Sequence, residues 1–245
     1  MLLKIATFNV NSIKARLNNV DAWLKQANPD IILLQEIKCQ DSQFPVEHFK
    51  ALGFESFVKG QKAYNGVAIL SKYPATLRID HLPGDPSDEQ ARYLEIEHKN
   101  LIIASLYLPN GNPVKGQTDK EKEKFPYKLA WMKRLKAHIR DTLLPSERAF
   151  ILGGDYNICP HDKDCYDVKA FEHDALLHPD SRGLFREIVN LGVSEAFDTL
   201  SPDHIEYSYW DYMKSRFDKD QGLRIDHFLL SPEASILMRK CCIDR

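Results

Sequence analysis

The sequence predicts a mixed α/β fold in a single domain. Short apolar runs that suit strands alternate with stretches in which apolar residues recur at helical spacing, along nearly the whole 245-residue chain. With 43% hydrophobic residues, a chain of this length can bury a large core without disulfides or a structural metal ion. The sequence contains no internal repeat, linker or low-complexity segment. We therefore expect one domain over residues 1–245.

The first three elements are predicted as strand, helix and strand. Residues 3–10 suit an extended segment, and apolar residues at helical spacing over 13–24 predict a helix that Asn28-Pro29 ends. Residues 31–34 form an uninterrupted apolar run, which is typical of a buried strand. Glu36 follows this run, so a carboxylate lies at the end of a strand, where sites built on sheets are usually found.

The same alternation continues toward the C-terminus. Pro45 suits the start of a short helix. Further strands are expected at residues 66–70, 92–97, 101–108 and 150–154. A long helix is expected from Pro126, with an apolar face formed by Leu129, Met132, Ile139 and Leu143. Residues 158–181 have no periodic pattern, which in a compact domain is typical of a functional or a disordered loop.

The composition favours an intracellular protein without a membrane partner. The five cysteines are odd in number and include no Cys-x-x-Cys pair, which argues against a zinc ribbon or a secreted disulfide framework. The N-terminal apolar run is too short for a signal peptide, and no stretch reaches the ~18 apolar residues that a membrane-spanning helix needs. We therefore expect a soluble protein of the cytoplasm.

Charge is distributed unevenly along the chain. The formal net charge is −2, which is unusual for a protein that binds duplex DNA through overall charge. Residues 112–140 carry nine Lys or Arg against three acids, a net charge of +6. A solvated helix with internal ion pairs accounts for residues 120–123, whereas Lys124 is the better candidate for a phosphate contact.

The run Gly153-Gly154-Asp155-Tyr156-Asn157 ends an apolar strand and carries the strongest chemical signal. In an extended segment residues i and i+2 share a face, so Asp155 and Asn157 can point into one site. A carboxylate that exchanges a proton, beside an amide that orients a substrate or a water, suits hydrolysis of a phosphate ester. A strand that ends in an Asx turn has the same residues, so the run alone leaves both interpretations open.

Further motifs, taken in order along the chain, resemble the signatures of one family. They are Phe8-Asn9-Val10-Asn11-Ser12-Ile13-Lys14-Ala15-Arg16, Leu34-Gln35-Glu36, Asn65-Gly66-Val67-Ala68-Ile69-Leu70, Tyr107-Leu108-Pro109-Asn110-Gly111, the Gly-Gly-Asp-Tyr-Asn run and Gly222-Leu223-Arg224-Ile225-Asp226-His227. Over residues 8–231 the chain thus resembles the exonuclease III family of bacterial exodeoxyribonucleases III and apurinic/apyrimidinic endonucleases, within the endonuclease/exonuclease/phosphatase superfamily.

The resemblance implies a fold and an activity. The fold would be a four-layer α/β sandwich, in which two mostly antiparallel sheets pack face to face with helices outside. The activity would be that of a DNA repair hydrolase of base excision repair. It would cut the phosphodiester 5′ of abasic sites in duplex DNA, with 3′–5′ exonuclease activity and repair of blocked 3′ ends. Such an enzyme is expected to use Mg²⁺, with Mn²⁺ as a substitute, and to act as a monomer.

The resemblance also assigns roles to the residues of the site. Glu36 and Asn9 would hold the metal ion, an oxygen-rich pair that suits Mg²⁺. Tyr107 would face the phosphate, Asp155 would be the acid or base, and Asn157 would position the water or the phosphate. Asp226 would orient a histidine toward the scissile phosphate. Without the resemblance, Glu36 could cap a strand and Tyr107 could belong to the core.

Other residues would bind the DNA. Tyr209, Trp210 and Leu223 match positions that line the pocket for a flipped-out abasic sugar, although aromatic residues at this spacing are also common in cores. The candidates for phosphate and backbone contacts are Asn11, Lys14, Arg92 and Lys124. Lys14 stands where the family often has Arg, and it gives up a bidentate contact.

One part of the family pattern is absent from the sequence. The closing Ser-Asp-His motif should follow Asp226 by some tens of residues, but the sequence ends at Arg245. We therefore expect that a C-terminal strand carrying this histidine is missing. Two alternatives remain: a phosphodiesterase or phosphatase of the same superfamily that acts on a lipid or small phosphoester, and a catalytically impaired DNA-binding truncation.

Overall fold

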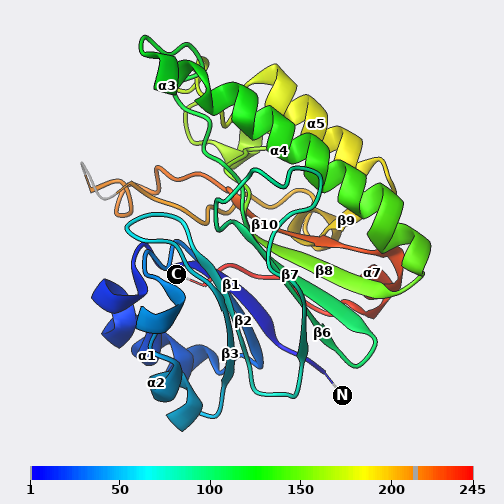
Figure 1. Cartoon of the computed structure of the whole chain (residues 1–245). Coiled ribbons are helices and arrows are strands. Elements are labelled where there is room, and N and C mark those ends of the chain that lie inside the picture. Colours follow the sequence, from blue (N-terminus) through cyan, green and yellow to red (C-terminus); the bar gives the residue numbers. More distant parts are fainter. Residues whose placement is uncertain (1, 212–214, 245) are drawn as a thin grey trace. The chain divides into compact units, whose positions relative to one another are not determined.

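The computed structural model describes residues 2–211 and 215–244 (Figure 1). Its strands form two mixed sheets, one of four strands and one of six. The chain divides into two compact units, the first comprising Met1–Tyr107 and Arg148–Asp155 and the second Leu108–Glu147 and Tyr156–Arg245. Within the described ranges, no helix is long and apolar enough to span a bilayer.

The four-stranded sheet of the first unit has the order β1-β2-β4-β3. Strand β1 (Ile5–Asn9) runs parallel to β2 (Ile31–Gln35), and β4 (Val67–Ser71) runs antiparallel to both β2 and β3 (Glu55–Lys59). Every residue of β2 and β4 is buried. This burial explains why the residues of β2 form a continuous apolar run rather than an alternating pattern.

Two helices cover the outer face of this sheet (Figure 1), and their ends follow local rules. Helix α1 (Ile13–Ala27) begins after Ser12, whose side chain accepts a hydrogen bond from the backbone of Ala15. It ends at Asn28, which adopts the left-handed conformation and donates its backbone N–H to the carbonyl of Leu24. Helix α2 (Val46–Ala51) follows Pro45 after a 3₁₀ turn at Asp41–Gln43. The predicted ends of α1 and start of α2 are confirmed.

The second sheet contributes four strands to the first unit, in the order β5-β6-β7-β8. They are β5 (Thr76–Ile79), β6 (Tyr93–His98), β7 (Leu101–Tyr107) and β8 (Ala149–Asp155). The pairs β5/β6 and β6/β7 are antiparallel, whereas β7 and β8 are parallel. These strands pack on the four-stranded sheet, with β8 against β1 and β7 against β2.

A buried polar contact links the two layers of the first unit. The side-chain amide of Gln35 donates to the hydroxyl of Ser105 at 3.0 Å, and this hydroxyl donates to the carbonyl of Leu34 at 3.1 Å. Both side chains are fully buried, so the bonds satisfy groups that water cannot reach.

The second unit is built around two helices and a short ladder. Helices α4 (Lys124–His138) and α5 (Pro179–Val189) pack side by side (Figure 1). Strand β10 (Asp226–Leu230) pairs antiparallel with β9 (Ser194–Glu195). The remaining elements are α3 (Asp119–Lys122), a π-helical turn at Ile139–Leu143, 3₁₀ turns at Leu144–Ser146 and Asp162–Asp164, α6 (Ala196–Leu200) and α7 (Pro232–Leu237).

Two details differ from the sequence prediction. The long helix starts at Lys124 rather than Pro126, because Pro is tolerated in the first turn as well as at its start. Its buried face includes Lys128, which is fully buried, whereas Leu129 is only partly buried. A single-domain organisation and the absence of a C-terminal strand stay predictions.

Candidate active site

Four polar side chains at strand ends in the first unit form what we call the carboxylate cluster: Asn9, Glu36, Tyr107 and Asp155. Asn9, Tyr107 and Asp155 are the last residues of β1, β7 and β8, and Glu36 follows β2 directly. Because β1/β2 and β7/β8 are parallel pairs, each pair ends at the same edge of its sheet. The strand order thus gathers residues that are up to 146 positions apart in sequence.

The amide group of Asn9 connects the two acids of the carboxylate cluster. Its Nδ2 donates to Oε1 of Glu36 at 2.8 Å and to Oδ2 of Asp155 at 2.9 Å. Its Oδ1 accepts the backbone N–H of Asn11 at 3.1 Å, which fixes the orientation of the amide. One neutral donor group therefore holds two carboxylates close together, although their charges repel.

Glu36 remains ionised in this environment. Burial raises its pKa, but hydrogen bonds from Lys38, Asn9 and Tyr107 and the charge of Lys38 together bring the pKa below its usual value. The Lys38 ammonium lies 2.8 Å from Oε2 of Glu36 and also donates to the side chain of Asn11. A cation therefore already neighbours the carboxylate for which a metal role is predicted.

Tyr107 is held as a neutral hydrogen-bond donor. Burial raises the pKa of its phenol far above the usual value, and the negative charges of Glu36 and Asp155 raise it further. The Arg92 guanidinium lies over the ring, 4.7 Å from the centroid, and donates to the Tyr107 carbonyl at 3.2 Å. Arg92, which is predicted to contact phosphate, thus fixes the position of the Tyr107 ring.

The backbone near the carboxylate cluster is unusual at several positions. Asn11, Ser12, Glu36 and Lys38 all have positive φ angles, between 41° and 86°. Such conformations cost about 1–3 kcal/mol for residues other than glycine and tend to gather at functional sites. The turns that follow β1 and β2 therefore keep their shape only because the surrounding contacts hold them.

Only glycine fits at position 154, directly before Asp155. A Cβ atom at Gly154 would lie 1.9 Å from the carbonyl oxygen of Leu106 on the neighbouring strand. The residues Gly154 and Leu106 are direct partners in the β7/β8 ladder. The glycine thus lets β8 approach β7 closely enough to set the position of Asp155.

In the second unit, Asn157 belongs to a group that we call the amide cluster: Leu108, Asn110, Lys128 and Asn157. The Asn157 side chain donates to the Leu108 carbonyl at 2.9 Å and accepts from the Asn110 amide at 3.2 Å. Lys128 donates to the backbone carbonyls of Asn110 and Asn157. Asn157 itself has a positive φ of 48°. The sequence motif contained Asn110, but neither Asn110 nor Lys128 was predicted as a site residue.

The residues predicted to line the sugar pocket also lie in the second unit. Tyr209 and Leu223 form an isolated antiparallel bridge with hydrogen bonds of 2.9 and 2.8 Å. Tyr209 is 40% exposed, whereas Leu223 is buried. The ring of Trp210 lies 5.1 Å from that of Phe217 and 6.4 Å from that of Tyr207. Tyr209 and Leu223 are thus paired, while Trp210 packs among neighbouring aromatic rings.

Asp226 is the first residue of β10, and its backbone N–H donates to the Ser208 hydroxyl at 3.1 Å. The same hydroxyl accepts the N–H of Ile225.

The predicted DNA contacts at Asn11, Lys14 and Lys124 are exposed.

Arg224 was missed by the sequence prediction, although it lies in a quoted motif. Its guanidinium is 1% exposed and forms ion pairs with Asp164, Glu195 and Asp198 at 2.8–3.1 Å. Its backbone N–H donates to the Asp164 carbonyl. A buried cation with three acidic partners anchors the segment that carries Leu223, just before β10. The signal in the sequence was a charged residue between the apolar residues Leu223 and Ile225, which requires partners when buried.

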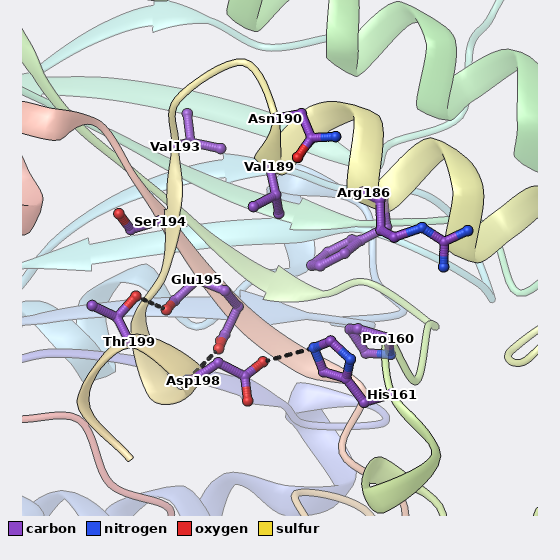
Figure 2. Close-up of a pocket in the computed structure, with 11 residues that line it drawn as sticks. Pro160, His161, Arg186, Val189, Asn190, Val193, Ser194, Glu195, Asp198 and Thr199 are labelled. Carbon is purple, nitrogen blue, oxygen red and sulfur yellow. Dashed lines mark hydrogen bonds and ion pairs between the residues drawn. The ribbon is translucent and has the colours of Figure 1, made fainter. Parts of the chain in front are cut away.

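A cavity of about 350 Å³ lies beside this ion cluster (Figure 2). Its apolar wall includes Phe185, Val189 and Val193, and its polar wall includes Glu195 and Asp198. Figure 2 shows Asp198 turned toward His161, with which it pairs at 3.5 Å. None of the predicted site residues lines this cavity.

Comparison with known proteins decides the family. The family model described as "Endonuclease/Exonuclease/phosphatase family" matches residues 6–243. The chain belongs to this family. It is 31% identical to exodeoxyribonuclease III of Haemophilus influenzae over 99% of this chain and 91% of that protein. It is 28% identical to an exodeoxyribonuclease of Bacillus subtilis over 94% of this chain and 88% of that protein.

Solved structures agree with this assignment. A 3′ phosphatase from Neisseria bound to a product DNA hairpin has a TM-score of 0.89 and 32% identity, over 96% of this chain and 89% of that one. An AP endonuclease from Archaeoglobus fulgidus has a TM-score of 0.88 and 30% identity, over 96% and 89% of the two chains. The predicted family, the α/β sandwich of two sheets and the prediction of an enzyme are confirmed.

Enzymes of the endonuclease/exonuclease/phosphatase family depend on a divalent metal ion, and the donor atoms at Glu36 fit one. Within the described part of the chain, no three His, Cys, Asp or Glu side chains gather as they would around an ion held by protein ligands alone. Mg²⁺ does not need such a group, because it keeps several waters and uses one or two carboxylates. The anionic Glu36 suits this role. Asn9 could add its oxygen only if its amide turned over, since its nitrogen faces Glu36.

Proposed function

We propose that this chain is a DNA repair nuclease that hydrolyses the phosphodiester 5′ of abasic sites in duplex DNA, and that it also trims or repairs 3′ ends. The names of its relatives support DNA as the substrate, since they include exodeoxyribonucleases, an AP endonuclease and a 3′ phosphatase. The observation that carries the proposal is the pair of carboxylates bridged by Asn9, at 2.8 and 2.9 Å.

Separate tasks in hydrolysis suit three residues of the carboxylate cluster and Asn157 of the amide cluster. Glu36 would hold the metal ion, which when bound supplies positive charge that stabilises the phosphate oxygens. Asp155 would accept the proton of the attacking water or deliver one to the departing 3′ oxygen. Tyr107 keeps its proton even in alkaline solution, because burial and the two nearby carboxylates raise its pKa, so it can donate a hydrogen bond to a non-bridging oxygen. Asn157 would orient the phosphate or the water.

DNA binding is expected to depend on a few local contacts. Lys14 and Lys124 are exposed cations, and Asn11 is exposed beside the carboxylate cluster. Arg92 is fixed against Tyr107. Three residues are proposed to receive the abasic sugar: Tyr209, Trp210 and Leu223. Asp226 is proposed to orient a histidine toward the scissile phosphate, as the family pattern implies. Recognition would require no base contacts, because an abasic nucleotide leaves the stack easily.

We further propose that the metal is Mg²⁺, with Mn²⁺ as a substitute, and that the enzyme acts as a monomer in the cytoplasm. The five cysteines are free, which suits a reducing compartment.

Cleavage of an abasic duplex tests the proposal. The wild-type chain should cut the duplex with Mg²⁺ and lose activity in EDTA. Glu36→Ala should be impaired most at low Mg²⁺ and partly rescued by excess metal, whereas the exposed Glu47→Ala should behave as wild type. Full activity in EDTA would contradict the metal assignment. Cleavage of a lipid or small phosphoester, but not of any DNA duplex, would favour the other branch of the family.

A further inference from the structure

Lys128 is a fully buried lysine in the middle of α4. Lysine is almost never fully buried unless its ammonium group is paired. Here the Nζ atom donates to the backbone carbonyl of Asn157 at 2.6 Å and to that of Asn110 at 3.1 Å. The short distance to Asn157 is typical of a hydrogen bond from a charged donor, which is roughly twice as strong as a neutral one.

The two carbonyls belong to the segments that follow β7 and β8 in the chain. The side chains of these segments are also connected, since the Asn110 amide donates to Oδ1 of Asn157 and Nδ2 of Asn157 donates to the Leu108 carbonyl. The backbone and the side chain of Asn157 are therefore both fixed, and Lys128 is the group that ties the two segments to α4.

The local backbone is built around this contact. Gly111 has a φ of +84°, and a Cβ atom there would lie 2.6 Å from Cδ of Lys128. Asn157 has a φ of +48°, which for a residue other than glycine costs about 1–3 kcal/mol and needs support from its surroundings. The bond from Lys128 to the carbonyl of Asn157 supplies such support at the residue that is strained.

We propose that Lys128 is a positioning residue for catalysis, which sets the orientation of the Asn157 side chain through the Asn157 backbone. The proposal rests on the role of Asn157 in phosphodiester hydrolysis. Lys128 is buried and acts through Asn157, so it has no direct part in DNA binding. Loss of its ammonium group should therefore reduce turnover while leaving DNA affinity unchanged.

The experiment compares Lys128→Met with Lys133→Met, an exposed lysine of the same helix. A misplacement of about 1 Å can reduce the rate by about 10²-fold. We expect kcat of Lys128→Met to fall by about this factor, with KM and the Kd for uncut duplex in EDTA unchanged. Lys133→Met should match wild type. A fall in DNA affinity equal to the fall in kcat would overturn the proposal.

A double-mutant cycle separates positioning from a general effect on the fold. Because Lys128 is inferred to act through Asn157, Lys128→Met should add little further loss of kcat in an Asn157→Ala background. Two losses that multiply independently would mean that Lys128 acts elsewhere. Such additivity would also overturn the proposal.

Two controls keep the test decisive. All variants are assayed at a temperature where circular dichroism shows them folded. If Lys128→Met does not fold, Lys128→Arg takes its place in the same cycle, since it keeps the charge but exchanges a compact donor for a planar fork. The cycle is run on whichever duplex the wild-type chain cleaves, abasic or 3′-phosphorylated. Failure of the abasic assignment is thereby separated from failure of the role of Lys128.

Discussion

Replacement of Lys38 by Met should raise the pKa of Glu36 and lower the Mg²⁺ concentration that the enzyme needs. The Lys38 ammonium lies 2.8 Å from Glu36, and the two side chains are only 28% and 19% exposed. A hydrogen bond to a charged group contributes about 1.5–3 kcal/mol, and partial exposure places this pair near the lower end. About 1.4 kcal/mol corresponds to one pKa unit or a tenfold change in affinity.

The contacts of Glu36 determine the direction in which its pKa changes. Burial raises its pKa, and Lys38 is the largest of the groups that lower it, so the pKa must rise when Lys38 is removed. The acidic limb of the rate profile should then move to higher pH. At pH 8, where Glu36 stays ionised, loss of the competing ammonium should lower the half-saturating Mg²⁺ concentration by up to about tenfold.

The assay is steady-state cleavage of an abasic duplex between pH 5 and 9 over a series of Mg²⁺ concentrations. Lys50→Met, a change of an exposed lysine on α2, is the matched control and should leave both quantities unchanged. An unshifted acidic limb together with an unchanged Mg²⁺ requirement would refute the reasoning. A higher Mg²⁺ requirement at pH 8 would mean that Lys38 assists the site rather than competing with the ion.

Three further changes test the site and the fold. Asp155→Asn should leave DNA binding intact and reduce turnover by ~10²–10⁴-fold, measured by single-turnover cleavage; an equal loss of binding would indicate a folding role. Lys124→Ala should reduce the slope of log affinity against log salt by about one, and an unchanged slope would exclude a phosphate contact there. Gly154→Ala should lower the free energy of unfolding by about 1–3 kcal/mol, because the new Cβ atom would meet the carbonyl oxygen of Leu106 at 1.9 Å. Gly183→Ala, in open space on α5, should not destabilise the fold in the same thermal melts.

The parts of the fold that follow local rules could be predicted from the sequence. The continuous apolar run of β2 predicted a buried strand, and Asn28 predicted the end of α1. The acids Glu36 and Asp155 were predicted at strand ends because each comes one or two residues after an apolar run. In each case the physical cause acts within a few residues, so it is visible in the sequence.

The contacts that hold the site could not be predicted in the same way. Which atom of Asn9 faces the acids depends on Asp155, which is 146 residues away in sequence. Arg224 can be buried because it pairs with Asp164, Glu195 and Asp198, and these acids come from other segments of the chain. Lys128 occupies a position on α4 where helical periodicity alone favours its neighbour Leu129. Burial of a charge is decided by distant partners, and a single sequence does not reveal them.

The charges of the carboxylate cluster indicate why the proposed chemistry would need a divalent ion. Glu36 and Asp155 as carboxylates give the cluster itself a charge of −2, because its other members, Asn9 and Tyr107, are neutral. The neighbouring cations, Lys38 beside Glu36 and Arg92 over the Tyr107 ring, only balance this charge. A divalent ion at Glu36 would make the site positive and attract the phosphodiester, which is itself an anion. Neutral donors at Asn9 and Tyr107 thus leave the sign of the site under the control of the bound metal.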